Sequence, residues 1–148
     1  MRRFIIVQAL GCSLAAAISA GDATTKDQDA IQGIWQIVEE IENGDKKPPD
    51  KDVMIVFDGN KWVLKVGKQV EKTGKFKLDA TKTPKVIVVN VDGEPEYAIY
   101  SLKKDTLKLC SFTNRDASKK APPREFTSTK ENGQSLVTLQ RQKKSEKR

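Results

Sequence analysis

The sequence contains no histidine, which removes the commonest general base and the commonest metal ligand available at neutral pH. Ser-His-Asp triads and histidine-based zinc sites are therefore excluded. Cysteine is almost as scarce: only Cys12 and Cys110 occur, and Cys12 lies in an N-terminal segment that we expect to be removed. Cys110 then has no intramolecular partner, so we predict a fold without a disulfide.

Cys110 is the one residue of the expected mature chain that offers nucleophilic or redox chemistry. It shares strand parity with Lys108, and nearby lysines would lower the pKa of its thiol. The competing interpretation, which we prefer, is a small and partly buried apolar residue near a strand end. We therefore predict no enzyme activity and no cofactor; the alternative is a histidine-free enzyme, esterase-like or isomerase-like, that uses carboxylates or Cys110.

Long apolar runs are absent except at the N-terminus, where residues 4–18 form one after Arg2 and Arg3. Small residues at positions 19 and 20 complete the pattern of a signal peptide. The run is short for a membrane span of about 20 residues. A retained anchor, or a lipid attached at Cys12, is the alternative. We expect cleavage after Ala20 or Ala23, export to the periplasm or the extracellular space, and no stable transmembrane segment after processing.

The remaining chain divides into a disordered leader over residues 21–28, one domain over residues 29–142 and a charged tail over residues 143–148. The formal charge of the whole chain is +7, carried by dispersed lysines. A nucleic-acid surface would instead show clustered arginine with exposed aromatic side chains. We therefore expect a monomer with a solvated lysine-rich surface that binds no nucleic acid.

Short runs of alternating apolar and polar residues follow one another through the domain. Trp62 and Leu64 alternate with Lys61 and Lys65, which is typical of an antiparallel strand with one wet face. Asn-Gly and Asp-Gly pairs separate several of these runs, as in β-hairpins. The strands predicted in this way are 35–41, 53–57, 61–66, 72–78, 85–91, 97–102, 106–110, 124–128 and 135–141.

This spacing, without any βαβ alternation, predicts an all-β fold: a single antiparallel β-barrel of about eight to nine strands. One helical turn over residues 27–32 is expected before it, capped by Asp27 or Asp29. Residues Trp35, Ile37, Glu39 and Ile41 should share one face of the first strand. The strand over residues 85–91 is apolar on both faces, so its outer side should be covered.

Grouped carboxylates offer one candidate for a metal site. Glu39, Glu40 and Glu42 lie near the end of the first strand, and Asp50 and Asp52 follow in the next loop. Carboxylate oxygens suit Ca²⁺, but this spacing matches no calcium-binding loop. We interpret these residues as solvated acids and expect no metal.

The motif Gly33-Ile34-Trp35 after a helical turn resembles the signature of lipocalins and related calycins. The resemblance implies that Trp35 plugs the closed end of the barrel and that Arg141, from the last strand, lies across its indole ring. Gly33 would then allow a close approach of neighbouring chain. These three residues form the expected structural closure of the barrel.

Residues 29–142 also resemble a family of small, uncharacterised lipocalin-like domains from planctomycete bacteria. The resemblance implies a fold but no known activity. The stretches that carry this resemblance are 32–35, 73–79, 83–85, 99–100, 105–110, 123–126 and 139–141.

A filled core is the simpler interpretation of the inward-facing apolar residues, but the resemblance to carrier proteins favours a cavity inside the barrel. The expected ligand is a small apolar or amphipathic molecule, bound at the end opposite Trp35, with loop 45–52 as a lid. The alternative is a protein-interaction or inhibitor domain with a filled barrel, which binds an envelope protein through loops such as 111–123. The interior residues expected to contact a ligand are Ile37, Phe57, Trp62, Leu64, Phe76, Tyr100 and Leu107.

Overall fold

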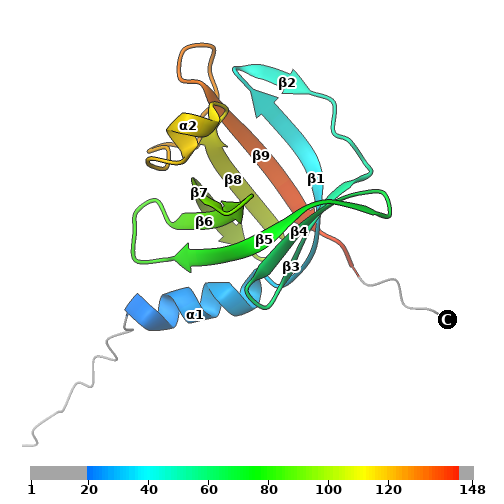
Figure 1. Cartoon of the computed structure of the whole chain (residues 1–148), viewed down its shortest axis with the longest axis vertical. Helices are drawn as coiled ribbons and strands as arrows, with labels where there is room; N and C mark the ends of the chain where they lie inside the picture. The colour runs from blue at the N-terminus through cyan, green and yellow to red at the C-terminus, as the bar shows by residue number, and fades with distance from the viewer. Residues whose placement is uncertain (1–19, 144–148) are drawn as a thin grey trace, which may run out of the picture.

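The computed structural model describes residues 20–143, which form one β-barrel with a helix at its lower end (Figure 1). Residues 1–19 of the expected signal peptide and residues 144–148 of the expected charged tail lie outside the described residues. The helices are α1 (Ala20–Ala30) and α2 (Arg115–Ser118). The strands are β1 (Gly33–Glu42), β2 (Asp45–Lys47), β3 (Val53–Asp58), β4 (Lys61–Val66), β5 (Gln69–Asp79), β6 (Val86–Val91), β7 (Glu94–Lys103), β8 (Thr106–Phe112) and β9 (Gln134–Arg141).

Every strand pairing in the sheet is antiparallel, and β9 pairs with β1 to close it into a barrel. Eight strands, β1 and β3 to β9, make the cylinder, and β2 is an extra strand on the end of β1. Figure 1 shows the last strand running beside the first. The predicted all-β antiparallel barrel is therefore confirmed. Closure leaves few free strand edges in a domain whose one described cysteine is unpaired.

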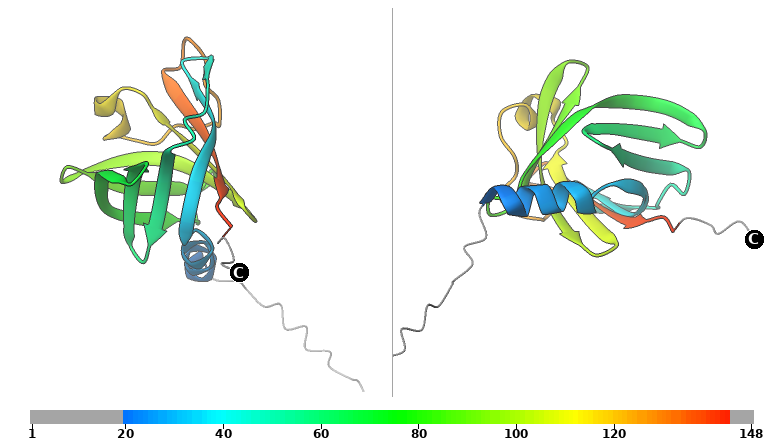
Figure 2. Two further views of the ribbon diagram at one scale, coloured as in Figure 1. Left: turned by 90° about the vertical axis from the view of Figure 1, so that its right-hand side faces the viewer. Right: turned by 90° about the horizontal axis from the view of Figure 1, so that it is seen from below.

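The helix α1 runs across one end of the barrel, which we call the closed end (Figure 2). Side chains of α1 attach it to the turns at that end. Gln28 donates a hydrogen bond to the carbonyl oxygen of Gly59, and the hydroxyl of Thr24 accepts one from the backbone N–H of Ala80. Ile31, just after the helix, is fully buried in the core. The helix therefore covers the closed end and is anchored there.

The sequence predicted one helical turn after a disordered leader, whereas α1 already begins at Ala20. Asp27 caps nothing and lies inside the helix, where its carboxylate is nearly buried. It accepts hydrogen bonds from the hydroxyl of Tyr100 at 2.7 Å and from Nζ of Lys85 at 2.8 Å. The sequence offered no sign of this long-range contact, because its partners lie 58 and 73 residues away.

The first and last strands meet at the closed end through Trp35 and Arg141, which are paired across the ladder. The guanidinium carbon of Arg141 lies 4.3 Å from the centroid of the fully buried indole ring. The same guanidinium donates hydrogen bonds to the carbonyl oxygens of Ala30 and Gln32. The expected arrangement of these two residues is thus present, and it also holds the end of α1.

Gly33 has a φ of +127°, and a Cβ atom there would lie 2.9 Å from Nη1 of Arg141. The close approach expected at this glycine is therefore that of a guanidinium rather than of neighbouring backbone. A side chain at position 33 would both strain the backbone and displace Arg141.

The predicted strand over residues 124–128 is not formed, because this segment lies as a loop on the outer face of β7 to β9. Carbonyl oxygens of Glu125 and Thr127 accept hydrogen bonds from the side-chain amide of Gln134. The loop covers outward-facing Ile99 and Cys110, which are almost wholly buried. The cover expected over β6 thus lies over β7 to β9 instead.

The prediction that one face of the first strand carries Trp35, Ile37, Glu39 and Ile41 is wrong beyond Ile37. The pairing of β1 with β9 shifts between Ile37 and Glu39, which is a β-bulge. After the bulge Glu40 pairs with Val137, and Glu42 pairs with Ser135, so these two glutamates take the inward face. Ile41 pairs with Leu136 and takes the outward face.

Candidate functional site

The interior of the barrel contains a cavity of about 200 Å³ on the side away from α1. Its lining is mostly apolar and comes from seven strands, β1, β3, β4 and β6 to β9. The lining residues are Ile37, Ile55, Phe57, Trp62, Ile87, Val89, Glu96, Tyr97, Ala98, Leu109, Ser111 and Val137. The cavity is smaller than the roughly 300–1,000 Å³ usual for pockets that hold drug-sized ligands.

Three of the residues expected to contact a ligand line this cavity: Ile37, Phe57 and Trp62. The other four belong to the packed part of the interior. Phe76, Tyr100 and Leu107 are buried core residues, and Leu64 packs against that core. The sequence thus identified the inward faces but could not separate the filled half of the barrel from the hollow half.

Aromatic side chains make one wall of the cavity. Phe57 meets Phe76 edge-to-face, with ring centroids 4.9 Å apart. The indole N–H of Trp62 donates to the carbonyl oxygen of Asn90 at 3.2 Å. This bond passes over Gly74, where a Cβ atom would lie 2.0 Å from that oxygen. Gly74 of β5 therefore leaves room for the Trp62 indole of β4 to reach the backbone of β6, which fixes the orientation of the ring.

The polar groups of the site lie at the mouth of the barrel, the end opposite α1. Glu96 and Ser111 are on the cavity lining. The pairing of Glu96 with Val89 and of Glu94 with Val91 places both glutamates on the inward face of β7. The bulge in β1 adds Glu40 and Glu42 to the same mouth.

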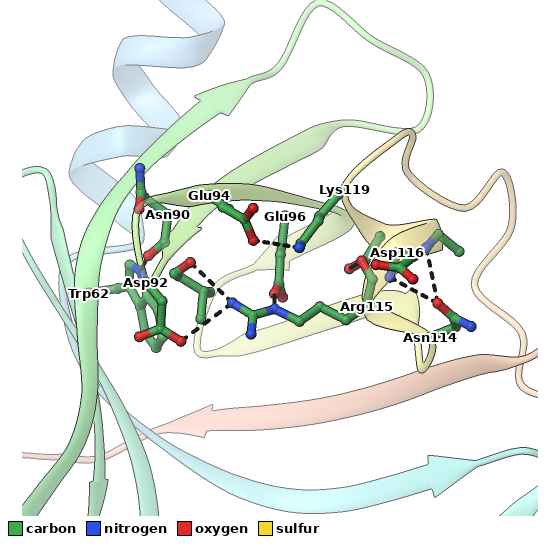
Figure 3. A network of polar contacts seen from close by, with 12 residues as sticks. Trp62, Asn90, Asp92, Glu94, Glu96, Asn114, Arg115, Asp116 and Lys119 are labelled. Carbon is green, nitrogen blue, oxygen red and sulfur yellow. Dashed lines mark hydrogen bonds and ion pairs between the residues drawn. The ribbon is translucent and has the colours of Figure 1, made fainter.

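The short helix α2 lies beside this mouth and is tied to the β6–β7 hairpin (Figure 3). Nε of Arg115 lies 2.8 Å from a carboxylate oxygen of Glu96, and its Nη2 lies 3.4 Å from Asp92. Nη2 also donates to the carbonyl oxygen of Val91. Lys119 forms an ion pair with Glu94.

These contacts change the proton affinity of the groups that they join. The hydrogen bond to Glu96 raises the pKa of Arg115 above its ordinary value. The hydrogen bond from Lys119 lowers the pKa of Glu94.

Asn114 caps the start of α2, because its side-chain oxygen accepts hydrogen bonds from the backbone N–H groups of Asp116 and Ala117. A local cap therefore positions both basic residues over the acidic hairpin.

The loop that was expected to be a lid, residues 45–52, also lies at the mouth. Its first part is β2, paired with the end of β1. Lys47 forms an ion pair with Glu42, and Lys46 forms one with Glu39 at 3.1 Å. The acids grouped in the sequence are thus partly neutralised by lysines. Within residues 20–143 no three metal-ligating side chains come together.

Cys110 does not offer a reactive thiol. It is on the outward face of β8, as its parity with Lys108 predicted, but the loop that contains Glu125 covers it completely. Burial raises the pKa of its thiol above the ordinary value. The side-chain amide of Gln134 lies 3.4 Å from the sulfur. A protonated, covered thiol is a packing element rather than a nucleophile.

Comparison with protein-family models, with curated proteins and with solved structures finds no match for this chain. Neither helix of the described segment is long and apolar enough to cross a lipid bilayer. The function therefore has to be inferred from the cavity and its mouth.

Proposed function

We propose that this protein is a non-enzymatic binding module that holds one small apolar or amphipathic molecule inside its barrel. The observation that carries the proposal is the cavity of about 200 Å³, with aromatic and aliphatic walls and polar groups only towards the mouth. Small barrels of eight strands either fill their interior with side chains or hold one small ligand. Export and a monomeric state are part of the same proposal.

The size of the cavity narrows the ligand. An engineered apolar cavity of about 150 Å³ binds benzene. By proportion, about 200 Å³ holds roughly eight non-hydrogen atoms, which is one ring with a short substituent. A long-chain fatty acid would have to leave most of its chain outside the barrel.

Membership of the lipocalin-like group is likewise a proposal. It is supported by the up-and-down order of the eight barrel strands and by the contact between Trp35 and Arg141 at the closed end. The contact between Trp35 and Arg141 is the one that the resemblance implied. Neither feature identifies a ligand, because one barrel architecture serves many unrelated functions.

Tryptophan fluorescence tests the proposal because the two tryptophans lie in different places. Trp62 is on the cavity wall, whereas Trp35 lies under Arg141 at the closed end. We expect a panel of small aromatic and branched aliphatic compounds to give saturable quenching that Trp62→Phe abolishes and Trp35→Phe retains. Isothermal calorimetry on the same variants reports binding without relying on fluorescence. Absence of saturable binding across the panel would refute the proposal.

A blocked variant gives an independent control. Ala98 lines the cavity, and Ala98→Leu would place three further carbon atoms in it. We expect this variant to fold with unchanged circular dichroism and to lose ligand binding. Retention of full affinity would show that the ligand binds elsewhere.

The small cavity is also compatible with the second hypothesis, which is a protein-interaction or inhibitor domain. Its specific support is the segment 112–134, whose outer surface has a groove of about 480 Å³ lined by Phe112, Pro122 and Arg124, among others. The partner expected for this role is an envelope protein. Cross-linking in an envelope fraction, with Arg124→Glu as the disrupting variant, tests it; an unchanged cross-linking pattern would count against this role.

A further inference from the structure

The inward face at the mouth of the cavity carries four carboxylates. Glu40, Glu42, Glu94 and Glu96 all take inward positions at the mouth ends of their strands. Ion pairs join three of them to Lys47, Lys119 and Arg115. Among the described residues, Glu40 has no ion-pair partner within 4 Å. The polar end of a bound molecule therefore meets carboxylates at the mouth, of which Glu40 is not neutralised by an ion pair.

Glu96 is the only acidic or basic side chain among the described residues that line the cavity. Its side chain is about one-quarter exposed, so it borders both the apolar interior and solvent. One of its oxygens, Oε1, accepts the hydrogen bond from Arg115. A carboxylate has room for further donors on both of its oxygens, so Glu96 can accept another without giving up Arg115.

Arg115 does not turn the site into one for anions. It is not on the cavity lining, its side chain is about half exposed, and its guanidinium is held by Glu96, Asp92 and the carbonyl oxygen of Val91. An anionic ligand would have to lie beside Glu96 while competing with it for Arg115. A cationic ligand would instead share Glu96 with Arg115, and the repulsion between the two cations is weakened because the guanidinium is about half exposed and also paired with Asp92.

From these observations we infer that the barrel selects a small organic amine. Its ring or branched alkyl group lies against Phe57 and Trp62, and its ammonium group donates to Glu96 at the mouth. The inference rests on the proposed binding function and names the chemical class of its ligand. The aromatic wall favours an aryl-substituted amine, because the ring packs against other rings and the nearby cation is attracted to their faces.

Three probes of one shape and different charge test the inference: benzylamine, benzyl alcohol and benzoate. Calorimetric titration of the full chain should give the tightest binding for benzylamine, by about tenfold over benzyl alcohol, with benzoate weakest. A tenfold ratio is at the low end of what a charge-assisted hydrogen bond contributes. Binding of benzyl alcohol without any preference for benzylamine would overturn the inference and leave the binding function standing. Failure of all three probes would overturn both.

Glu96→Gln removes the charge and keeps the shape of the side chain. We expect it to lower benzylamine affinity about tenfold or more, to leave benzyl alcohol within about twofold, and to improve benzoate. Asp58→Asn is the matched control, since it removes one acidic charge from an exposed turn at the closed end and leaves an Asn-Gly turn. Loss of the amine preference in both variants, or in neither, would contradict the role of Glu96.

A measurement on the unaltered protein covers the case in which Glu96→Gln does not fold. Raising the ionic strength from about 0.01 M to 0.5 M screens charge pairs that are partly exposed. Benzylamine affinity should fall several-fold over this range, while benzyl alcohol affinity stays constant. Equal salt dependence of the two probes would overturn the inference.

Discussion

Replacement of Arg141 by alanine tests how the barrel is closed, because one side chain joins the last strand, the first strand and α1. The guanidinium stacks on Trp35 at 4.3 Å and donates to the carbonyl oxygens of Ala30 and Gln32. It also lies 3.1 Å from a carboxylate oxygen of Asp105. All four contacts are lost together in Arg141→Ala.

The four contacts differ in how much each contributes to the free energy of unfolding. The cation–π contact over a buried ring contributes about 0.5–2 kcal/mol. Hydrogen bonds from a charged donor contribute about 1.5–3 kcal/mol each in isolation, but the two carbonyl oxygens can bind water once the side chain is removed. The Asp105 carboxylate is 68% exposed, so that ion pair contributes at most about 1 kcal/mol. Because the contacts share one group they do not add, and we expect a loss of about 3 kcal/mol.

Thermal and urea unfolding followed by circular dichroism measure this loss. For a domain of this size about 3 kcal/mol corresponds to a fall in Tm of roughly 10–15 °C. Arg124→Ala is the control, since Arg124 is an exposed arginine outside the strands. The Tm of Arg141→Lys should lie between those of the two alanine variants, because a lysine retains the charge but not the planar stack. If Arg141→Ala unfolds at the same temperature as Arg124→Ala, the closure does not depend on this side chain.

Three further predictions concern the packing around the same core. Gly33→Ala should lower the free energy of unfolding by about 1–3 kcal/mol in urea titrations, since position 33 combines a φ of +127° with the guanidinium 2.9 Å away. Gly74→Ala should cost about as much, and should also change near-ultraviolet dichroism through Trp62, because its Cβ would meet the carbonyl oxygen of Asn90. Burial and the contact with Asp27 raise the pKa of Tyr100 above its ordinary 10.0. Its contribution is therefore complete below about pH 10 and falls as the pH rises further, so urea unfolding should show a steeper alkaline loss of stability in the unaltered protein than in Tyr100→Phe.

The architecture was predictable because the signals for it are local. Hairpin turns such as Asp92-Gly93 and alternation such as that of Trp62 and Leu64 need only neighbouring residues to act. The closing pair of Trp35 and Arg141 was accessible only through a resemblance, since 106 positions separate the two residues in the sequence. Helix α1 was underestimated because its residues are mostly polar. Its position depends on tertiary contacts of Thr24, Asp27 and Gln28.

The candidate site was less predictable, because two features that shape it have no local signal. The mouth is bordered by α2, and the salt links of Arg115 and Lys119 to the β6–β7 hairpin join segments about 20 residues apart. The division of the interior into a filled half and a hollow half depends on the summed volumes of side chains from all strands. Phe76 and Phe57 were equally good candidates by alternation, but only Phe57 lines the cavity.

The β-bulge in β1 shows how one extra residue changes the chemistry of the mouth. A regular strand would continue the inward face from Ile37 through Glu39 to Ile41, which would place one carboxylate and one apolar side chain there. The bulge exchanges the faces, so that Glu40 and Glu42 turn inward and Ile41 turns outward. Since the walls below remain apolar, the carboxylates at the mouth would affect only the polar end of a bound molecule. In the binding function proposed above, the apolar walls would therefore set the size of the ligand, and Glu96 at the mouth would select the sign of its charge.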